Sequence, residues 1–271
     1  MNGLQPLDRR TFLADLGRAA FALAVVTVAG CAPSGQGTPS LSASAAPTGP
    51  GSSGPGGGTN APTAASSGAP PPASGDAVAW ERVNLGFVSA YILVRAGEAA
   101  IVDTGVSGSA DAIEASLTGV GLDWSAIGHL ILTHRHGDHA GSAADILERA
   151  ADATGYAGAE DIGAITVPRA LTAVGDGDGV FGLQIVTTPG HTAGSISVLD
   201  PVGGILVAGD ALGTDGGRPT LPGAQFTDDM DQAQQSIVKL GEMTFETLLV
   251  GHGEPIETGA SAAVAELGAA G

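Results

Sequence analysis

The sequence predicts an α/β fold for the part of the chain that follows residue 77. Short apolar runs rich in β-branched residues alternate there with patterns of helical spacing, an order that is typical of α/β layers. Most of the apolar runs end at a glycine or a polar turn residue, as the strands of a sheet do. The chain has 271 residues and is 43% hydrophobic, which allows one or two domains with a buried core.

The expected elements follow one another in a mixed order. Strands are expected at 77–85, 87–94, 99–105, 129–133, 164–168, 183–189, 195–199, 204–210 and 245–255, and helices at 109–121, 142–151, 228–243 and 260–270. Ile113, Leu117 and Val120 recur at helical spacing in the first helix. Asp228 and Asp229 open the third helix as cap and first-turn acids. This order is consistent with two mixed sheets flanked by helices, and periodicity alone leaves other α/β layouts open.

Residues 1–31 have the composition of an export signal. Three arginines precede an apolar run of 12 residues at 19–30, which ends directly before Cys31. Such a run suits a signal peptide, because a bilayer span needs about 20 residues. The sequence "VAGC" resembles the lipobox of bacterial lipoproteins, which implies that Cys31 receives lipid and anchors the protein to a membrane. A short hydrophobic anchor that is never cleaved is the alternative.

The route and the final location follow from the same segment. "DRRTFL" resembles a twin-arginine export motif, although Asp8 and Ala14 depart from its usual residues, so the Tat and Sec routes are both open. Cys31 is the only cysteine, which excludes an intrachain disulfide and a cysteine metal ligand. We expect the protein at the extracytoplasmic face of a bacterial cell membrane, held there by lipid.

Residues 32–77 are rich in Pro, Gly, Ser and Ala and contain one charged residue, Asp76. A segment with so few large apolar side chains cannot offset the entropy lost on folding, so it predicts a disordered linker. Residues 78–271 form the remaining domain. They contain 7 basic and 25 acidic residues, which accounts for the formal net charge of −18. Nucleic acid is excluded as a partner, since phosphate binding needs clustered Lys and Arg.

Three of the six histidines lie in "ILTHRHGDHAG", residues 131–141, at the end of an expected strand. Residues two apart in an extended segment point the same way, so His134 and His136 can face one metal ion. Asp138 and His139 then face elsewhere, toward a second ion. Imidazole together with carboxylate suits zinc, iron or manganese rather than calcium.

Further candidate ligands follow other apolar runs. His191 comes after "IVTTPG", Asp210 after "ILVAG" and His252 after "LLVG". Loops at strand ends are where a rigid sheet positions functional groups, so the pattern indicates a metal site built from several strand ends. His129 lies inside an expected strand and is given no role. Ser195 is interpreted as the start of a strand rather than as a nucleophile.

These residues carry a family resemblance. "THRHGDHAG" is similar to the T-H-x-H-x-D-H-x-G signature of the metallo-β-lactamase superfamily, and "VDTG", "PGHT", "GD" and "GHG" match the other motifs of that family in order. The resemblance covers residues 83–256. It implies a four-layer αββα sandwich of two mixed sheets flanked by helices, with a two-metal hydrolytic site at the sheet edges.

Carried over residue by residue, the resemblance implies seven metal ligands. The first ion would be bound by His134, His136 and His191, the second by Asp138, His139 and His252, and Asp210 would bridge both. Asp103 of "VDTG" matches a family position that supports the site without ligating. The cofactors implied are two divalent ions, with zinc as the first choice and iron or manganese as alternatives.

The implied reaction is hydrolysis of a small-molecule substrate by a hydroxide held between two ions, which lower the pKa of water to about 7. Asp138 would also relay protons. The ligand set resembles those of glyoxalase II and of acyl-homoserine lactonases, whereas true zinc lactamases carry Cys or Ser at the position of Asp210. We therefore expect an ester, thioester or lactone substrate. A β-lactam hydrolase and a non-catalytic zinc-binding lipoprotein are the alternatives.

The segments 153–180 and 212–228 lie between the expected ligands and are expected to line the substrate pocket. Within them, Tyr156 and Arg218 are the expected substrate contacts. Glyoxalase II carries a helical extension with basic residues that bind glutathione. The 19 residues that follow His252 show no such extension, so we do not expect a glutathione thioester.

The lipobox yields a first prediction. We expect Cys31→Ser to move the protein from the membrane fraction to the soluble fraction, because a serine side chain cannot receive the thioether-linked lipid. Immunoblotting of fractionated cells measures this, with the unsubstituted chain as the control. Unchanged retention of the variant in membranes would contradict the lipid anchor.

Overall fold

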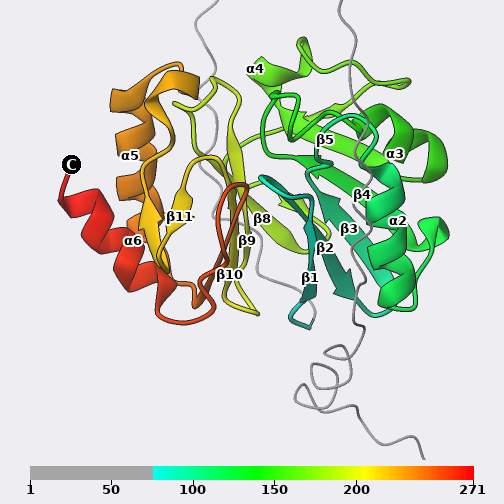
Figure 1. Ribbon diagram of the computed structural model, residues 1–271, viewed down its shortest axis with the longest axis horizontal. Coiled ribbons are helices and arrows are strands. Elements are labelled where there is room, and N and C mark those ends of the chain that lie inside the picture. The colour runs from blue at the N-terminus through cyan, green and yellow to red at the C-terminus, as the bar shows by residue number, and fades with distance from the viewer. Residues whose placement is uncertain (1–75) are drawn as a thin grey trace, which may run out of the picture. The chain divides into compact units, whose positions relative to one another are not determined.

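The computed structural model describes residues 76–271, so Cys31 and the predictions for 1–31 and 32–75 lie outside the described residues. Two large sheets lie face to face, and helices cover the outer side of each (Figure 1). The predicted α/β class and the αββα sandwich are confirmed. No helix among the described residues combines the length and the apolar character that a membrane span requires.

The first sheet has the strand order β1–β2–β3–β4–β5–β6. Its strands are β1 (Ala79–Asn84), β2 (Ser89–Arg95), β3 (Glu98–Val102), β4 (Ile127–Leu132), β5 (Thr154–Gly158) and β6 (Thr172–Val174). The first three strands pair antiparallel, and the pairs from β3 to β6 are parallel. Helices α2 (Ala110–Gly119) and α3 (Ala143–Arg149) cover its outer face, and a single helical turn, α4 (Ala159–Ile162), follows β5.

The second sheet has the order β13–β10–β9–β8–β7. Its strands are β7 (Gly179–Val180), β8 (Leu183–Thr187), β9 (Ile196–Asp200), β10 (Ile205–Gly209) and β13 (Thr247–Val250). Only β10 and β13 pair parallel. Helices α5 (Met230–Gly241) and α6 (Ala260–Ala269) cover its outer face, and a short hairpin of β11 (Gly213–Asp215) and β12 (Arg218–Thr220) follows β10.

The inner strands β2 and β3 of the first sheet are buried on both faces. Ile92 and Ile101 face the helices, where they join a cluster with α2 and α3, whereas Tyr91 and Leu93 face the second sheet and join the cluster between the sheets. A third cluster joins the second sheet to α5 and α6. Since successive side chains of a strand alternate between its faces, continuous apolar runs such as "AYILV" serve two core layers at once.

Most of the expected elements are confirmed, but the strand expected at 164–168 is wrong. That segment runs without regular structure, while Ile165 and Val167 pack against the helix-side core. The strand of this region is β5, "TGYAG", which has weak strand propensity. Gly158 is required there, because a Cβ at this position would lie 2.0 Å from the Gly194 backbone oxygen. Close packing therefore selects a sequence that does not resemble a strand.

The start of α5 agrees with the sequence. The side chain of Asp229 is the N-cap and accepts a hydrogen bond from the Gln232 backbone N–H at 2.9 Å. Asp228 instead forms an ion pair with Arg135. The cap fixes where the helix begins. The backbone N–H groups of Asp228 and Asp229 also donate to the carbonyl oxygens of His191 and Gly190, which joins the helix start to the loop after β8.

Candidate metal centre

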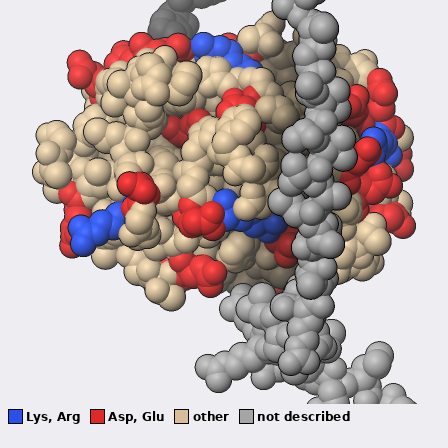
Figure 2. All heavy atoms as spheres, viewed as in Figure 1, with Lys and Arg blue, Asp and Glu red and all other residues tan. Residues whose placement is uncertain are grey.

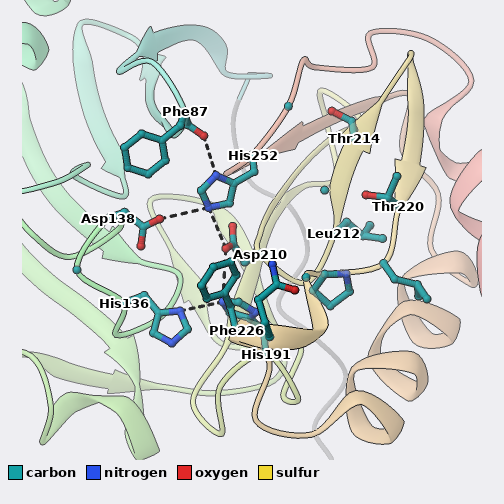
Figure 3. A pocket seen from close by; sticks show the side chains of 17 residues that line it. Phe87, His136, Asp138, His191, Asp210, Leu212, Thr214, Thr220, Phe226 and His252 are labelled. Carbon is teal, nitrogen blue, oxygen red and sulfur yellow. Dashed lines mark hydrogen bonds and ion pairs between the residues drawn. The ribbon is translucent and has the colours of Figure 1, made fainter.

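The seven side chains singled out as ligands come together at the carboxyl ends of the strands. Figure 3 shows those that line the cavity, His136, Asp138, His191, Asp210 and His252. Four of them follow β4, one follows β8, one follows β10 and one follows β13. In order along the chain they are His134, His136, Asp138, His139, His191, Asp210 and His252. The two sheets thus bring residues from distant parts of the sequence to one edge of the sandwich.

Three imidazoles form a first group. His136 Nδ1 lies 3.1 Å from His134 Nε2 and 2.9 Å from His191 Nε2. His134 and His191 are buried, and His136 is partly exposed. Three ring nitrogens converging at such distances can coordinate one metal ion.

A second group lies beside the first. His252 Nε2 is 3.3 Å from Asp138 Oδ2 and 3.5 Å from His139 Nε2. Asp210 lies between the two groups, because its Oδ2 is 3.4 Å from His191 Nε2 and 3.2 Å from His252 Nε2, and its Oδ1 is 3.2 Å from His139 Nε2. This carboxylate therefore contacts side chains of both groups.

Two imidazoles are oriented by acceptors behind them. His139 Nδ1 donates to the buried carboxylate of Asp103 at 2.8 Å, and His252 Nδ1 donates to the carbonyl oxygen of Phe87 at 2.7 Å. Because a neutral imidazole carries one proton, each ring then presents an unprotonated Nε2 to the centre. A partner of this kind is characteristic of metal-binding histidines.

Two threonine hydroxyls orient the other pair. Thr133 Oγ1 donates its proton to Asp103 at 2.7 Å, so it can only accept from His134 Nδ1 at 3.1 Å. Thr227 Oγ1 donates to the Gly223 carbonyl at 3.0 Å and accepts from His191 Nδ1 at 3.2 Å. With both hydroxyl protons committed, the Nε2 lone pairs of His134 and His191 also point inward.

The arrangement fits metal ions, because without a positive charge its acceptor atoms would repel one another. When both rings are neutral, lone pairs of His139 and His252 face one another beside the carboxylates of Asp138 and Asp210. Asp210 Oδ1 is buried and lacks a hydrogen-bond partner among the described residues, a position that a positive charge would satisfy. The nitrogen and oxygen donor set suits zinc, iron or manganese.

Protons compete with a metal ion for this centre. Burial lowers the pKa of His139, but the carboxylates of Asp103 and Asp210 outweigh it and raise the pKa to about 10. Burial lowers the pKa of His191 to about 4, despite the opposing charge of Asp210. Burial raises the pKa of Asp210, but His139 and the other imidazoles hold it well below its ordinary range. In the metal-free protein a proton on His139 therefore takes the place of a cation.

A buried carboxylate, Asp161, joins the two loops that supply the first group. It accepts hydrogen bonds from the Arg135 backbone N–H at 2.8 Å, from Thr192 Oγ1 at 2.6 Å and from the Gly194 N–H at 3.1 Å. Arg135 lies between two of the histidines, and Thr192 follows the third. Gly194 allows this approach, since a Cβ there would lie 2.6 Å from the Asp161 backbone nitrogen.

Two residues expected to contact substrate lie away from the centre. Tyr156 packs between the sheets, with its hydroxyl 3.3 Å from His129 Nδ1, and it does not line the cavity described below. Its strand, β5, directs this side chain inward. Arg218 is exposed on the β11–β12 hairpin and is likewise not a lining residue. Ser195 lies directly before β9, and its hydroxyl is engaged by Thr192.

The sequence reasoning singled out Asp103 as a supporting residue, and Asp103 contacts His139 and Thr133, but it missed the other residues that orient the ligands. Thr133 precedes His134 within the signature, so its position carried a local signal. Thr227, Asp161 and the Phe87 carbonyl carried none, because their contacts reach across long sequence separations. Such contacts exist only once the loops are folded together.

A cavity of about 700 Å³ opens directly over the centre. Five of the seven candidate ligands line it, and Asp138 and Asp210 are among them. Its other walls come from the turn between β1 and β2 and from residues 212–226. Of the two segments expected to line the pocket, 212–228 is therefore confirmed, whereas 153–180 contributes no lining residue.

The fold and the centre define a protein that can hold metal ions between the ends of two stacked sheets. The chain belongs to the metallo-β-lactamase superfamily, whose family model matches residues 83–252. It is 32% identical to metallo-beta-lactamase domain-containing protein 1 of Xenopus laevis over 60% of this chain and 70% of that protein.

Two further comparisons bear on the fold and the site. A hydroxyacylglutathione hydrolase of Erwinia tasmaniensis is 36% identical over 44% of this chain and 45% of its own length. The crystal structure of a metallo-beta-lactamase family protein from Thermus thermophilus superposes with a TM-score of 0.58 at 23% identity, covering 71% of this chain and 78% of that one. The structural likeness supports the sandwich fold alone.

We predict that Asp161→Asn lowers both the stability of the protein and its metal binding, although Asp161 is not a candidate ligand. The NH₂ group of the new amide would face N–H and O–H donors, and this loss of hydrogen bonds should lower the free energy of unfolding by about 2 kcal/mol. The metal content after dialysis should also fall. Thermal unfolding and elemental analysis measure both. Asp228→Asn is the matched control, because Asp228 binds the same guanidinium of Arg135 but is half exposed. Equal metal retention in both variants would contradict the positioning role.

We also predict that zinc binding near pH 7 releases protons. His139, with its pKa of about 10 in the metal-free protein, is protonated there, and the ion needs the Nε2 lone pair. Metal affinity should therefore fall as pH falls, by about tenfold per pH unit for each displaced proton. Calorimetric titration in two buffers of different ionisation enthalpy measures the release. A binding heat independent of the buffer would disprove it.

Proposed function

We propose that the protein is a metal-dependent hydrolase with two divalent ions, zinc first among them. His134, His136 and His191 would hold one ion, Asp138, His139 and His252 the other, and Asp210 would bridge them. The observation that carries the proposal is the position of Asp210, within 3.4 Å of ring nitrogens from both groups. A single-ion site would not need a carboxylate shared in this way.

When bound, the ions would polarise a substrate carbonyl and lower the pKa of water, so that hydroxide is available to attack the carbonyl. The chain's own residues prepare this step by holding the donors in one geometry. Asp103, Thr133 and Thr227 keep the imidazole rings in orientation, so little reorganisation is needed during the reaction. No serine or cysteine nucleophile lies among the residues that line the cavity within 76–271.

Asp138 is placed to handle protons. Its side chain is about a quarter exposed, lies 3.3 Å from His252 Nε2 and lines the cavity. A carboxylate at the boundary between the centre and the open cavity can pass a proton to a departing group. We therefore propose a second role for Asp138 in addition to ligation.

The proposed reaction is hydrolysis of an ester, thioester or lactone. Support comes from the ligand set, which retains a carboxylate at Asp210, and from the similarity to hydroxyacylglutathione hydrolases over about two fifths of this chain. We propose further that the enzyme acts outside the cytoplasm, tethered by lipid on Cys31. That placement would give it substrates from the surroundings of the cell.

Asp210→Asn tests the shared carboxylate. We expect kcat/KM for any ester substrate to fall by about 100-fold or more, because even residues behind metal ligands contribute up to that factor. The bound metal should fall below two ions per chain while circular dichroism stays unchanged. Asp215→Asn, on the exposed β11–β12 hairpin, is the control and should retain both. An active Asp210→Asn variant with one ion would refute the bridging role.

A metal-loaded protein that cleaves no ester, thioester or lactone would instead overturn the hydrolase proposal. Two bound ions without turnover would then favour metal capture. Elemental analysis combined with panels of these three substrate classes distinguishes the two results.

A further inference from the structure

We propose that the cavity selects uncharged acyl substrates with an apolar chain and rejects substrates that carry a remote carboxylate. This inference rests on the proposed hydrolase function and deepens it. It is based on two observations. One wall of the cavity is apolar, and almost every basic side chain of the domain binds a partner elsewhere.

The wall beside the metal centre is apolar and unusually exposed. Phe87, Leu221 and Phe226 line the cavity and are 64%, 42% and 65% exposed. They are three of the six large hydrophobic side chains that are exposed within residues 76–271. Concentration of such side chains at one cavity marks a surface that gains from contact with an apolar ligand.

These side chains approach the centre from two directions. The Phe87 ring stacks on His252 at 6.1 Å between ring centroids, from the turn between β1 and β2 (Figure 3). Phe226 comes from the 3-10 helix Ala224–Phe226, between β12 and α5, and directly precedes Thr227, which orients His191. A carbonyl held at the centre would therefore direct its chain along apolar walls on both sides.

No lysine or arginine is among the 17 residues that line the cavity. Two arginines that adjoin lining residues are held by other partners. Arg135 binds Asp161 and Asp228, and Arg82 binds Glu254 and the Gly253 carbonyl. A substrate carboxylate would have to compete with those contacts to bind either guanidinium group.

The other basic residues of the described domain show the same commitment. Arg95, Arg149 and Lys239 pair with acidic side chains, and Arg169 donates to three backbone carbonyls. Acidic side chains outnumber basic ones over the visible face (Figure 2). With 7 basic and 25 acidic residues in 78–271, the net charge of the domain disfavours the approach of anions.

Arg218 is the exception, since its side chain has no ion pair or hydrogen bond within residues 76–271. It lies on β12 two residues before Thr220, which lines the cavity. Its direct cross-strand neighbour is Asp215, so the tip of the hairpin adds no net positive charge. A carboxylate at the far end of an acyl chain would meet phenylalanine and leucine rather than a cation, and burial of an unpaired charge is unfavourable.

The substrate class follows from these contacts. Acyl esters, thioesters or lactones with a neutral hydrocarbon chain fit the cavity. Glutathione thioesters and β-lactams carry carboxylates away from the reacting carbonyl and would leave them without a basic partner. The cavity volume of about 700 Å³ is in the range that takes drug-sized molecules.

A matched pair of substrates tests the inference on the metal-loaded protein. p-Nitrophenyl octanoate and the mono-p-nitrophenyl ester of octanedioic acid have acyl chains of equal length, and only the second ends in a carboxylate. We expect kcat/KM to be about tenfold or more lower for the anionic ester. Among neutral esters from acetate to octanoate, kcat/KM should rise by about three- to fourfold per added methylene group until the wall is covered.

Substitutions in the wall should change the preference for neutral over anionic esters and the gain with chain length. Phe226→Ala should remove most of the gain with chain length, whereas Val202→Ala, an exposed residue outside the cavity, should not. Gln225→Lys places a cation in the wall and should raise kcat/KM for the anionic ester by about tenfold. Gln225→Met is its uncharged control and should not raise kcat/KM for the anionic ester.

A binding measurement separates this inference from the hydrolase proposal. Octanamide, a neutral amide, should displace the uncharged dye Nile red from the metal-free protein, and octanedioic acid monoamide should not. Equal displacement by both, or equal kcat/KM for both esters, would overturn the inference while leaving the hydrolase proposal intact. Selective displacement without turnover of any ester, thioester or lactone would support the apolar site and overturn the hydrolase proposal.

Discussion

The centre depends on the buried carboxylate of Asp103. One oxygen accepts the Nδ1 proton of His139 and the hydroxyl proton of Thr133, which in turn leaves Thr133 free only to accept from His134. One carboxylate therefore sets the inward-facing nitrogen of two imidazoles, directly and through a hydroxyl. Asp103 has a φ of 62°, a conformation that costs energy for a side chain other than glycine. The surrounding contacts of the strand ends hold it there.

The sandwich supplies a rigid frame for this network. Strands β3, β4, β10 and β13 end at the same edge, and their side chains alternate between two buried layers. A shift of one residue in register would turn each ligand to the wrong face. The loops beyond the strand ends are fixed by contacts such as those of Asp161 and Thr227, so the donors are placed before any ion or substrate arrives.

Charge divides the domain into two functional regions. The metal centre concentrates acceptors that only cations satisfy, and the adjoining cavity wall is apolar and without a free basic side chain. The acidic surface is consistent with both features, because it disfavours anionic ligands without affecting neutral ones. The proposed metal binding thus depends on the acceptors of the centre, and the proposed substrate choice depends on the cavity wall and on the arginines that are held elsewhere.

The alternation of strands and helices, the order of the motifs and the seven candidate ligands could all be predicted from the sequence, because strand-end motifs are local. The sequence did not reveal β5, because its glycines are set by close packing, Gly155 against Leu171 and Gly158 against Gly194. It also misplaced Tyr156, since "TGYAG" does not show which face a residue occupies. The partners of His191 and His252 and the apolar wall of the cavity emerged from the folded chain alone. Those partners lie more than thirty residues from the imidazoles that they orient, and their proximity is set by the tertiary fold.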